Sequence, residues 1–397
     1  MAVRVEPSRD EVIAFRLGAH QLSERLPEPG LLDAAGRCAV QDSPPGSALL
    51  ALHARVRGVT ADGLESALAD KSLLQTWSLR GAPFCFPTAD APVYTTGVLP
   101  PTEEAGRHFL PGVVPALDRL ELSLGEAVEL TGAELEGVLS GRRLAIGELG
   151  AEVAERVSGR LPKEQRAAWR QEGPYAKGQP LGEGVVHFCL RILALQGVVC
   201  FAPRAGNRAP FVLVTEWLGG PIPRVDPDAA RAEVLRRYLR CYGPSTRGQF
   251  AAWLGVRAGD TDPWWTLVED ELTEVDFRGT SWILTADVAA LRSSPMPQGV
   301  RLLPPRDPYT QLRDRDTILA EPHHRDVWKP VGEPGTVLVD GRIAGVWRPR
   351  RSGGRLNLAV TTFGQLSTGD RDRLADEAAQ LGPLRGAASV DIRFDGA

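Results

Sequence analysis

Two segments far apart in the chain carry the same short pattern, and this repetition limits the possible folds more than any other feature. Residues 79–90 read LRGAPFCFPTAD, and residues 277–287 read FRGTSWILTAD. In both, an Arg-Gly pair separates two apolar runs and the segment closes with Thr-Ala-Asp, which is typical of a β-hairpin. Repetition inside one chain indicates a fold assembled from similar units.

Helical patterns precede the first of these hairpins. Ser8 and Glu11 have the spacing of a capping box, which predicts a helix that begins there and is broken at residues 26–30. Further helices are expected over residues 46–58 and 60–70. Two helices joined by a short turn and followed by a hairpin are the order of a winged helix-turn-helix unit.

The same order recurs before the second hairpin. A helix is expected over residues 228–241, Thr246 and Gln249 have capping-box spacing, and Asp262 is expected to cap a helix that has Pro263 at its first position. A middle candidate has a helix over residues 185–195 and then a hairpin whose tip spans residues 204–208. We therefore expect three tandem winged-helix units.

From about residue 296 onward, short β-like runs replace the helical periodicity. Asp340–Gly341 separates two of these runs as a two-residue hairpin turn, and a last helix over residues 370–381 precedes a final strand. The predicted fold class is α+β. Its predicted domains are winged-helix units over residues 1–100, 101–222 and 223–295, followed by a C-terminal β-rich domain over residues 296–397.

Composition excludes several classes of protein. With 397 residues, 43% hydrophobic and 24% charged, the chain is predicted to be globular. No apolar stretch reaches the roughly 18 residues of a membrane span, and the N-terminus lacks an apolar signal core, which favours a cytoplasmic protein. The five cysteines are scattered, with no C-x-x-C pair and no histidine at ligand spacing. Buried reduced thiols, no metal site and no cofactor are therefore expected.

The net charge of −4 does not by itself indicate nucleic-acid binding, but two segments are locally basic. Residues 236–247 carry four arginines and residues 342–355 carry five, and neither segment has an acidic residue. Such arginines suit contacts with DNA phosphates, although surface arginines also simply cover apolar protein. The predicted DNA-binding residues are Arg80, Arg204, Arg208, Arg306, Arg348, Arg350 and Arg351.

Common enzyme motifs are missing from the sequence. It contains no phosphate-binding P-loop, no nucleophile elbow, no zinc-protease motif and no dinucleotide fingerprint, which argues against a nucleotide cofactor. His323 and His324 are adjacent, but neighbouring side chains point apart, so an exposed loop pair is expected rather than a metal site.

Gln41, Asp42 and Ser43 form an unusual polar group directly before Pro44, Pro45 and a helix. One interpretation is local: Asp42 or Ser43 caps the helix, and one of the prolines begins it. The other is functional, because polar side chains and outward-pointing backbone N–H groups then meet at a helix entrance. The residues alone leave both interpretations open.

The chain resembles the AlkZ/YcaQ-type family of bacterial winged-helix DNA glycosylases. The resemblance rests on the Gln41 segment with LLALHARVRG and on QTWSLRGAPFCFP, LQGVVCFAPRAGNRAPFVLVTEWL, RRYLRCYGPSTRGQFAAWLGV and PGTVLVDGRIAGVWRPR, which together touch nearly the whole chain. It implies tandem winged helices, a C-terminal β-rich domain, and double-stranded, damaged DNA as partner.

The resemblance also implies a catalytic site. The family motif is Gln-x-Gln or Gln-x-Asp; Gln41 matches its first position and Ser43 falls on its second, a departure for which Asp42 could substitute. The implied reaction is hydrolysis of the N-glycosidic bond of an alkylated purine or bulky adduct, with Gln41 holding the water. A DNA-binding protein without catalysis, and a partner-binding scaffold, are the alternatives that stay open.

Overall fold

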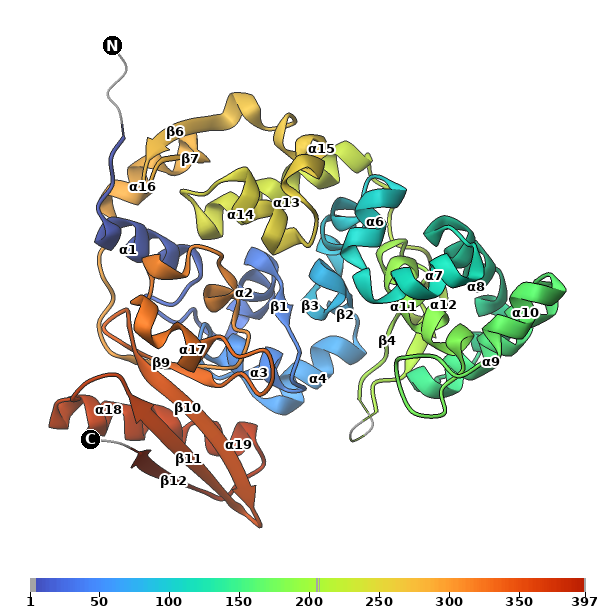
Figure 1. The fold of residues 1–397 in the computed structure, drawn as a ribbon. Helices are drawn as coiled ribbons and strands as arrows, with labels where there is room; N and C mark the ends of the chain where they lie inside the picture. The colour runs from blue at the N-terminus through green and yellow to red at the C-terminus, as the bar shows by residue number, and fades with distance from the viewer. Residues whose placement is uncertain (1–4, 205, 207, 396–397) are drawn as a thin grey trace. The chain divides into compact units, whose positions relative to one another are not determined.

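The computed structural model describes residues 5–204, 206 and 208–395 (Figure 1). The chain divides into two compact units. Unit 1 comprises Met1–Ser66, Leu235–Gln249 and Val268–Ala397, and unit 2 comprises Ala67–Val234 and Phe250–Leu267. Within the described residues, no helix combines the length and apolar character needed to cross a bilayer.

The first helices of the chain follow local capping signals. Helix α1 (Arg9–Ala19) begins as predicted: Ser8 Oγ accepts a hydrogen bond from Glu11 N–H at 3.2 Å, and the Glu11 carboxylate accepts from Ser8 N–H at 2.7 Å. Helices α3 (Ser47–His53) and α4 (Ala61–Ala69) are also present, although α3 ends five residues before the predicted end at residue 58. Helix α2 (Leu31–Cys38) was not predicted, because its first residues carry no capping signal.

The two repeated segments fold into similar hairpins. Strands β2 (Leu73–Trp77) and β3 (Pro83–Pro87) pair antiparallel in unit 2, and β6 (Leu272–Asp276) and β7 (Thr280–Leu284) pair antiparallel in unit 1. Both connections use the predicted Arg-Gly pair with positive φ angles: 54° and 63° at Arg80 and Gly81, and 57° and 97° at Arg278 and Gly279. The Arg-Gly pair therefore sets the same turn twice.

The closing Thr-Ala-Asp is equivalent in both hairpins as well. It forms a single 3₁₀ turn at Thr88–Asp90 and again at Thr285–Asp287. In each, the threonine hydroxyl donates a hydrogen bond to a carbonyl shortly before the first strand. The acceptor is Lys71 O at 2.5 Å, two residues before β2, in one hairpin and Glu271 O at 2.9 Å, one residue before β6, in the other. The sequence repetition thus corresponds to repeated local structure.

The C-terminal part of unit 1 contains the predicted β-rich structure. A five-stranded sheet has the order β12-β11-β10-β9-β8, with β11 and β12 parallel and the other pairs antiparallel. Asp340–Gly341 joins β9 to β10, as predicted. Helix α18 (Thr368–Ala379) packs against β8 and β12. The strands are β8 (Val300–Leu303), β9 (Gly335–Val339), β10 (Arg342–Ser352), β11 (Arg355–Thr362) and β12 (Ser389–Asp395).

The core of this sheet includes a residue from the N-terminal part of the chain. Alternate residues of β11 point inward, since Leu356, Leu358 and Val360 are buried and their neighbours are more exposed. They share one hydrophobic cluster with Leu374 of α18 and with Leu50 of α3. Helix α3, which follows the Gln41 segment directly, is therefore packed into the core of the C-terminal sheet.

Unit 2 is mainly helical. Helices α8 (Leu124–Leu139), α9 (Ile146–Arg160) and α11 (Leu181–Leu195) contact one another, and α11 continues into the hairpin of β4 (Val199–Phe201) and β5 (Phe211–Leu213).

The remaining helices and strands are distributed over both units. They are β1 (Val40–Gln41), α5 (Ala91–Tyr94), α6 (Glu103–Phe109), α7 (Val114–Leu120), α10 (Lys163–Trp169), α12 (Val214–Leu218), α13 (Pro227–Tyr242), α14 (Arg247–Leu254), α15 (Asp262–Trp265), α16 (Val288–Ser293), α17 (His324–Val327) and α19 (Leu381–Leu384).

Local capping predictions in the third quarter of the chain are mixed. Thr246 and Gln249 form the predicted box at the start of α14: Gln249 N–H donates to Thr246 Oγ1 at 3.2 Å and Thr246 N–H to Gln249 Oε1 at 3.0 Å. The prediction that Asp262 is a cap is wrong. It is the first residue of α15, because Thr261 already occupies the N-cap position. The number of winged-helix units stays a prediction.

A buried ion pair fixes the end of α3. The Arg55 guanidinium donates to both carboxylate oxygens of Asp307, at 2.8 and 2.7 Å, and also to Ala51 O at 2.8 Å. Both charged side chains are almost inaccessible, 2% and 0% exposed. Removal of one member of such a pair leaves an uncompensated buried charge, which costs about 3–5 kcal/mol.

We expect Asp307→Ala to lower the free energy of unfolding by about 3–5 kcal/mol in urea denaturation. The control is Asp391→Ala, which removes the partner of Arg355 from a pair that is 53% and 62% exposed. That change should cost less than about 1 kcal/mol. Equal losses in the two variants would contradict a structural role for the buried pair.

His53, the last residue of α3, is a second buried charge-sensitive group. It is 7% exposed, and neither ring nitrogen has a hydrogen-bond partner within the described residues. Burial, and then the charge of Arg25, lower the pKa of His53 from 6.5 to about 4. As pH falls through this interval the unfolded chain takes up a proton that the folded chain excludes, so the fold loses stability.

Between about pH 7.5 and 5, wild type should therefore lose roughly 2 kcal/mol more unfolding free energy than His53→Gln, which cannot titrate. Urea unfolding at both pH values measures this difference. His108→Gln, at an exposed histidine, serves as the control and should follow wild type. A His53→Gln curve parallel to wild type would argue against the excluded proton.

Candidate active site

The polar group singled out in the sequence lies at the end of β1, immediately before α3. Gln41 and Asp42 are 3% and 7% exposed, and Ser43 is half-buried. Buried polar side chains are costly unless they are hydrogen-bonded, so their place in an otherwise apolar region requires a local reason. For Asp42 the structure gives that reason.

Asp42 caps helix α3 from four residues upstream of Gly46. Its Oδ1 atom accepts hydrogen bonds from Gly46 N–H at 2.7 Å and from Ala48 N–H at 3.2 Å. The prediction that Pro44 or Pro45 begins the helix is wrong. α3 begins at Ser47, because a turn that ends at Gly46, at φ 85°, comes first. Asp42 therefore caps the helix while remaining buried.

Arg385 lies beside this turn, and no motif in the sequence predicted it as a site residue. It follows α19, which contacts α3. Burial lowers the pKa of Arg385, and the nearby charge of Asp42 opposes that shift. A Cβ on Gly46 would lie 3.8 Å from Arg385 Nη1. The Asp42 carboxylate is thus close to the positively charged Arg385, which lies far from it in the sequence.

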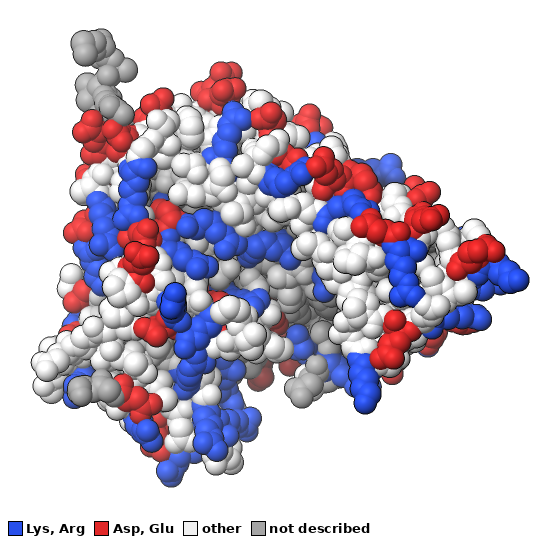
Figure 2. All heavy atoms as spheres, in the orientation of Figure 1, with Lys and Arg blue, Asp and Glu red and all other residues white. Residues whose placement is uncertain are grey.

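Arg385 and Arg351 form a basic strip that leads to the hairpin of β10 and β11. A Cβ on Gly386 would lie 3.7 Å from Nη1 of Arg351. The hairpin tip is Gly353–Gly354, since Ser352 pairs with Arg355. Figure 2 shows Lys and Arg side chains gathered over this hairpin, at the lower end of unit 1. The structure therefore places predicted catalytic and predicted DNA-binding residues in one region of unit 1.

The three hairpin arginines that were predicted to contact DNA are exposed but differ in their partners. Arg348 donates to Gly332 O at 2.7 Å, and Arg351 Nε donates to Gly353 O at 3.3 Å. The guanidinium of Arg350 has no hydrogen-bond or ion-pair partner in the part of the chain that the structure describes. Arg350 is thus the arginine most available to an external anion.

The other predicted DNA contacts belong to other segments of the chain. In unit 1, Arg306 is half-buried, and its backbone N–H donates to Glu333 Oε1 at 3.1 Å. In unit 2, the Arg80 guanidinium donates to Trp253 O, so it has a partner inside the protein. Arg204 and Arg208 line an aromatic hollow of about 330 Å³ with Trp77, Phe201 and Phe211, and two residues of that hairpin tip, Ala205 and Asn207, lie outside the described residues.

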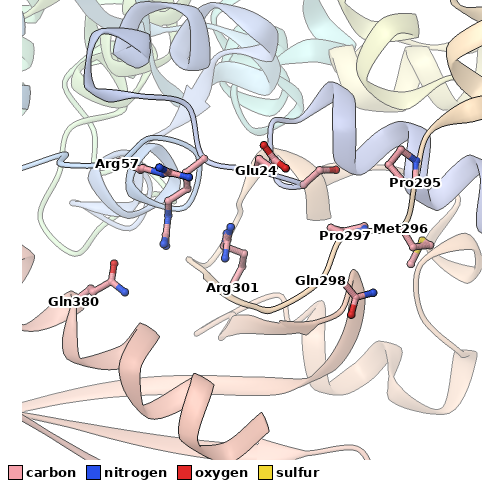
Figure 3. Close-up of a pocket in the computed structure, with 10 residues that line it drawn as sticks. Glu24, Arg57, Pro295, Met296, Pro297, Gln298, Arg301 and Gln380 are labelled. Atoms are coloured by element: carbon pink, nitrogen blue, oxygen red, sulfur yellow. The ribbon is translucent and has the colours of Figure 1, made fainter. Parts of the chain in front are cut away.

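Unit 1 contains a further basic hollow of about 700 Å³ (Figure 3). Arg57 and Arg301 enter it from different segments, with Gln380 of the α18 end across from them. Burial, and then the charge of Arg25, lower the pKa of Arg301. Arg25 is itself paired with Glu377 at 2.6 Å, which neutralises part of the charge.

Comparisons with known proteins identify the family of the chain. The family described as "DNA glycosylase AlkZ-like" matches residues 35–384. A Streptomyces sahachiroi protein described as an interstrand DNA cross-link repair glycosylase is 28% identical over 395 residues, 97% of this chain and 98% of the relative. The solved structure of Streptomyces sahachiroi DNA glycosylase AlkZ matches with a TM-score of 0.75 at 26% identity, covering 98% of this chain and 100% of that one. The chain therefore belongs to the AlkZ-like DNA glycosylase family.

Proposed function

We propose that this protein is a monofunctional DNA glycosylase that hydrolyses the N-glycosidic bond of alkylated purines, including bulky adducts. One observation carries the proposal: Gln41 and Asp42 are buried next to each other at the entrance of α3, beside the basic strip that leads to the β10–β11 hairpin. The strip offers phosphate contacts, and the two polar residues offer groups for the reaction.

The proposed reaction requires few catalytic groups. A purine alkylated on a ring nitrogen is already cationic, so it leaves without a strong general acid. The remaining sugar resembles an oxocarbenium ion, which a nearby carboxylate or dipole stabilises. We assign Gln41 to hold the attacking water through its amide, and Asp42 to stabilise the developing positive charge or to accept the proton of the water.

Ser43 falls where the family motif has Gln or Asp, and it cannot carry a negative charge. Asp42 is the neighbouring residue that has a carboxylate. Its Oδ1 atom is fixed by two backbone N–H groups, and Arg385 lies close by. Because a group held in this way needs no reorganisation when charge develops, Asp42 is suited to replace the missing acidic side chain.

DNA binding without catalysis is the second candidate function. The observation in its favour is the same departure at Ser43, together with the capping bonds that give Asp42 a structural role. In this alternative the basic strip binds damaged duplex and Gln41 only packs. The two candidate functions predict a difference in the release of the modified base, not in the affinity for DNA.

Gln41→Ala should lower glycosylase activity by about 10²–10³-fold, the typical cost of removing one preorganised polar group from a reacting centre. Duplex DNA containing N7-alkylguanine is incubated with the protein, and alkali then converts abasic sites to strand breaks. Gln365→Ala, which changes an exposed glutamine, is the matched control and should behave as wild type. A Gln41→Ala variant with full activity would refute the assigned role.

Asp42→Asn separates capping from catalysis. An asparagine Oδ1 can still accept from Gly46 N–H and Ala48 N–H, so the variant should fold with nearly unchanged unfolding free energy. Loss of the negative charge should nevertheless lower base release at least about tenfold in the same assay. If Asp42→Asn retained wild-type activity, Asp42 would be only a helix cap.

Arg350→Ala should weaken duplex binding and reduce the slope of log affinity against log salt by about one, as expected for one lost phosphate contact. Fluorescence anisotropy at several salt concentrations measures both quantities. Arg393→Ala is the control, because Arg393 is 84% exposed on β12 of the same sheet and pairs with Asp395. Equal losses in both variants would mean that only net charge matters.

A further inference from the structure

The core of unit 1 contains a cluster of one histidine and two cysteines from three separate segments. His20 follows α1, Cys38 ends α2 and Cys241 belongs to α13. One ligand-type atom from each residue lies within 4.8 Å of those from the other two, and the residues are 1%, 4% and 0% exposed. Among the described residues, no other group of His, Cys, Asp or Glu meets the same test.

The spacing inside this cluster fits a bound metal ion. Zinc binds thiolate sulfur at about 2.3 Å and imidazole nitrogen at about 2.0 Å, so two ligands of one tetrahedral ion lie roughly 3.5 Å apart. Cys38 Sγ lies 3.6 Å from His20 Nδ1. The carbonyl oxygen of Arg37 lies 3.7 Å from Cys241 Sγ and offers a fourth donor.

Burial and charge are also consistent with a cation at this point. Within the described residues, the polar contact of the buried His20 ring is made by Nδ1, which faces Cys38 Sγ, since Nε2 has no hydrogen-bond partner there. Thiols are weak hydrogen-bond donors, which makes the thiol contacts a poor reason for the cluster. Two thiolates and one divalent ion sum to zero, so the bound ion adds no net charge to the core.

We propose that His20, Cys38 and Cys241 form a closed structural site for a zinc ion. The ion joins the end of α1, the end of α2 and α13. Cys38 lies three positions before Gln41, so the site also fixes the segment that leads into Gln41 and Asp42. The sequence does not indicate the site, because neither cysteine lies at metal-ligand spacing from another cysteine or histidine. The proposal is independent of the glycosylase assignment.

The test uses the full-length protein, purified without chelators from zinc-supplemented cells. Mass-spectrometric metal analysis should give about one zinc per chain. Cys38→Ser and Cys241→Ser should lose it. Cys200→Ser, which changes a buried cysteine of unit 2, is the matched control and should retain it.

A spectroscopic measurement on wild type keeps the test decisive if the serine variants do not fold. Metal-free protein titrated with Co²⁺ should develop thiolate-to-metal charge-transfer absorption that Zn²⁺ abolishes, and Zn²⁺ should raise its melting temperature. Wild type with neither zinc nor the Co²⁺ absorption overturns the proposal. So does a thiol titration of the unfolded protein in excess chelator that finds two fewer reactive thiols than the five cysteines, because the pair would then be a disulfide.

Discussion

The position of the candidate active site depends on the bidentate ion pair between Arg55 and Asp307. Arg55 lies two residues after α3, and Asp307 lies shortly after β8, so the pair joins the N-terminal helices to the C-terminal sheet inside unit 1. Leu50, which lies on α3 itself, packs into the hydrophobic core of that sheet. Because α3 is held at its end by charge and along its length by apolar packing, the turn at its start has a fixed place beside Arg385 and the β10–β11 hairpin.

That turn explains how one residue can serve two purposes. A carboxylate that caps a helix must be held by backbone N–H groups, and a carboxylate that stabilises a transition state must already be in place when charge develops. Asp42 satisfies the first condition through Gly46 and Ala48. On our proposal, the same two bonds satisfy the second. The site would then use a capping residue in place of the acidic group that Ser43 lacks.

Features set by local interactions were predictable from sequence. The capping boxes at Ser8 and Thr246 and the two Arg-Gly turns depend on residues within four positions of one another, and the structure contains them all. The interpretation in which a proline begins α3 failed because a turn that ends at the left-handed residue Gly46 comes before the helix. Arg385 and the His20 cluster were missed for another reason: their partners are distant in the chain, and no spacing rule brings them together.

On our proposal, the Gln41 segment makes this protein an enzyme and not only a DNA-binding protein. The most direct measurement is the release of free base from duplex DNA carrying a single N7-alkylguanine, followed by liquid chromatography and mass spectrometry. If the proposal is correct, wild-type protein releases the modified base and leaves an intact strand with an abasic site. Tight binding to the same duplex without any released base would contradict it.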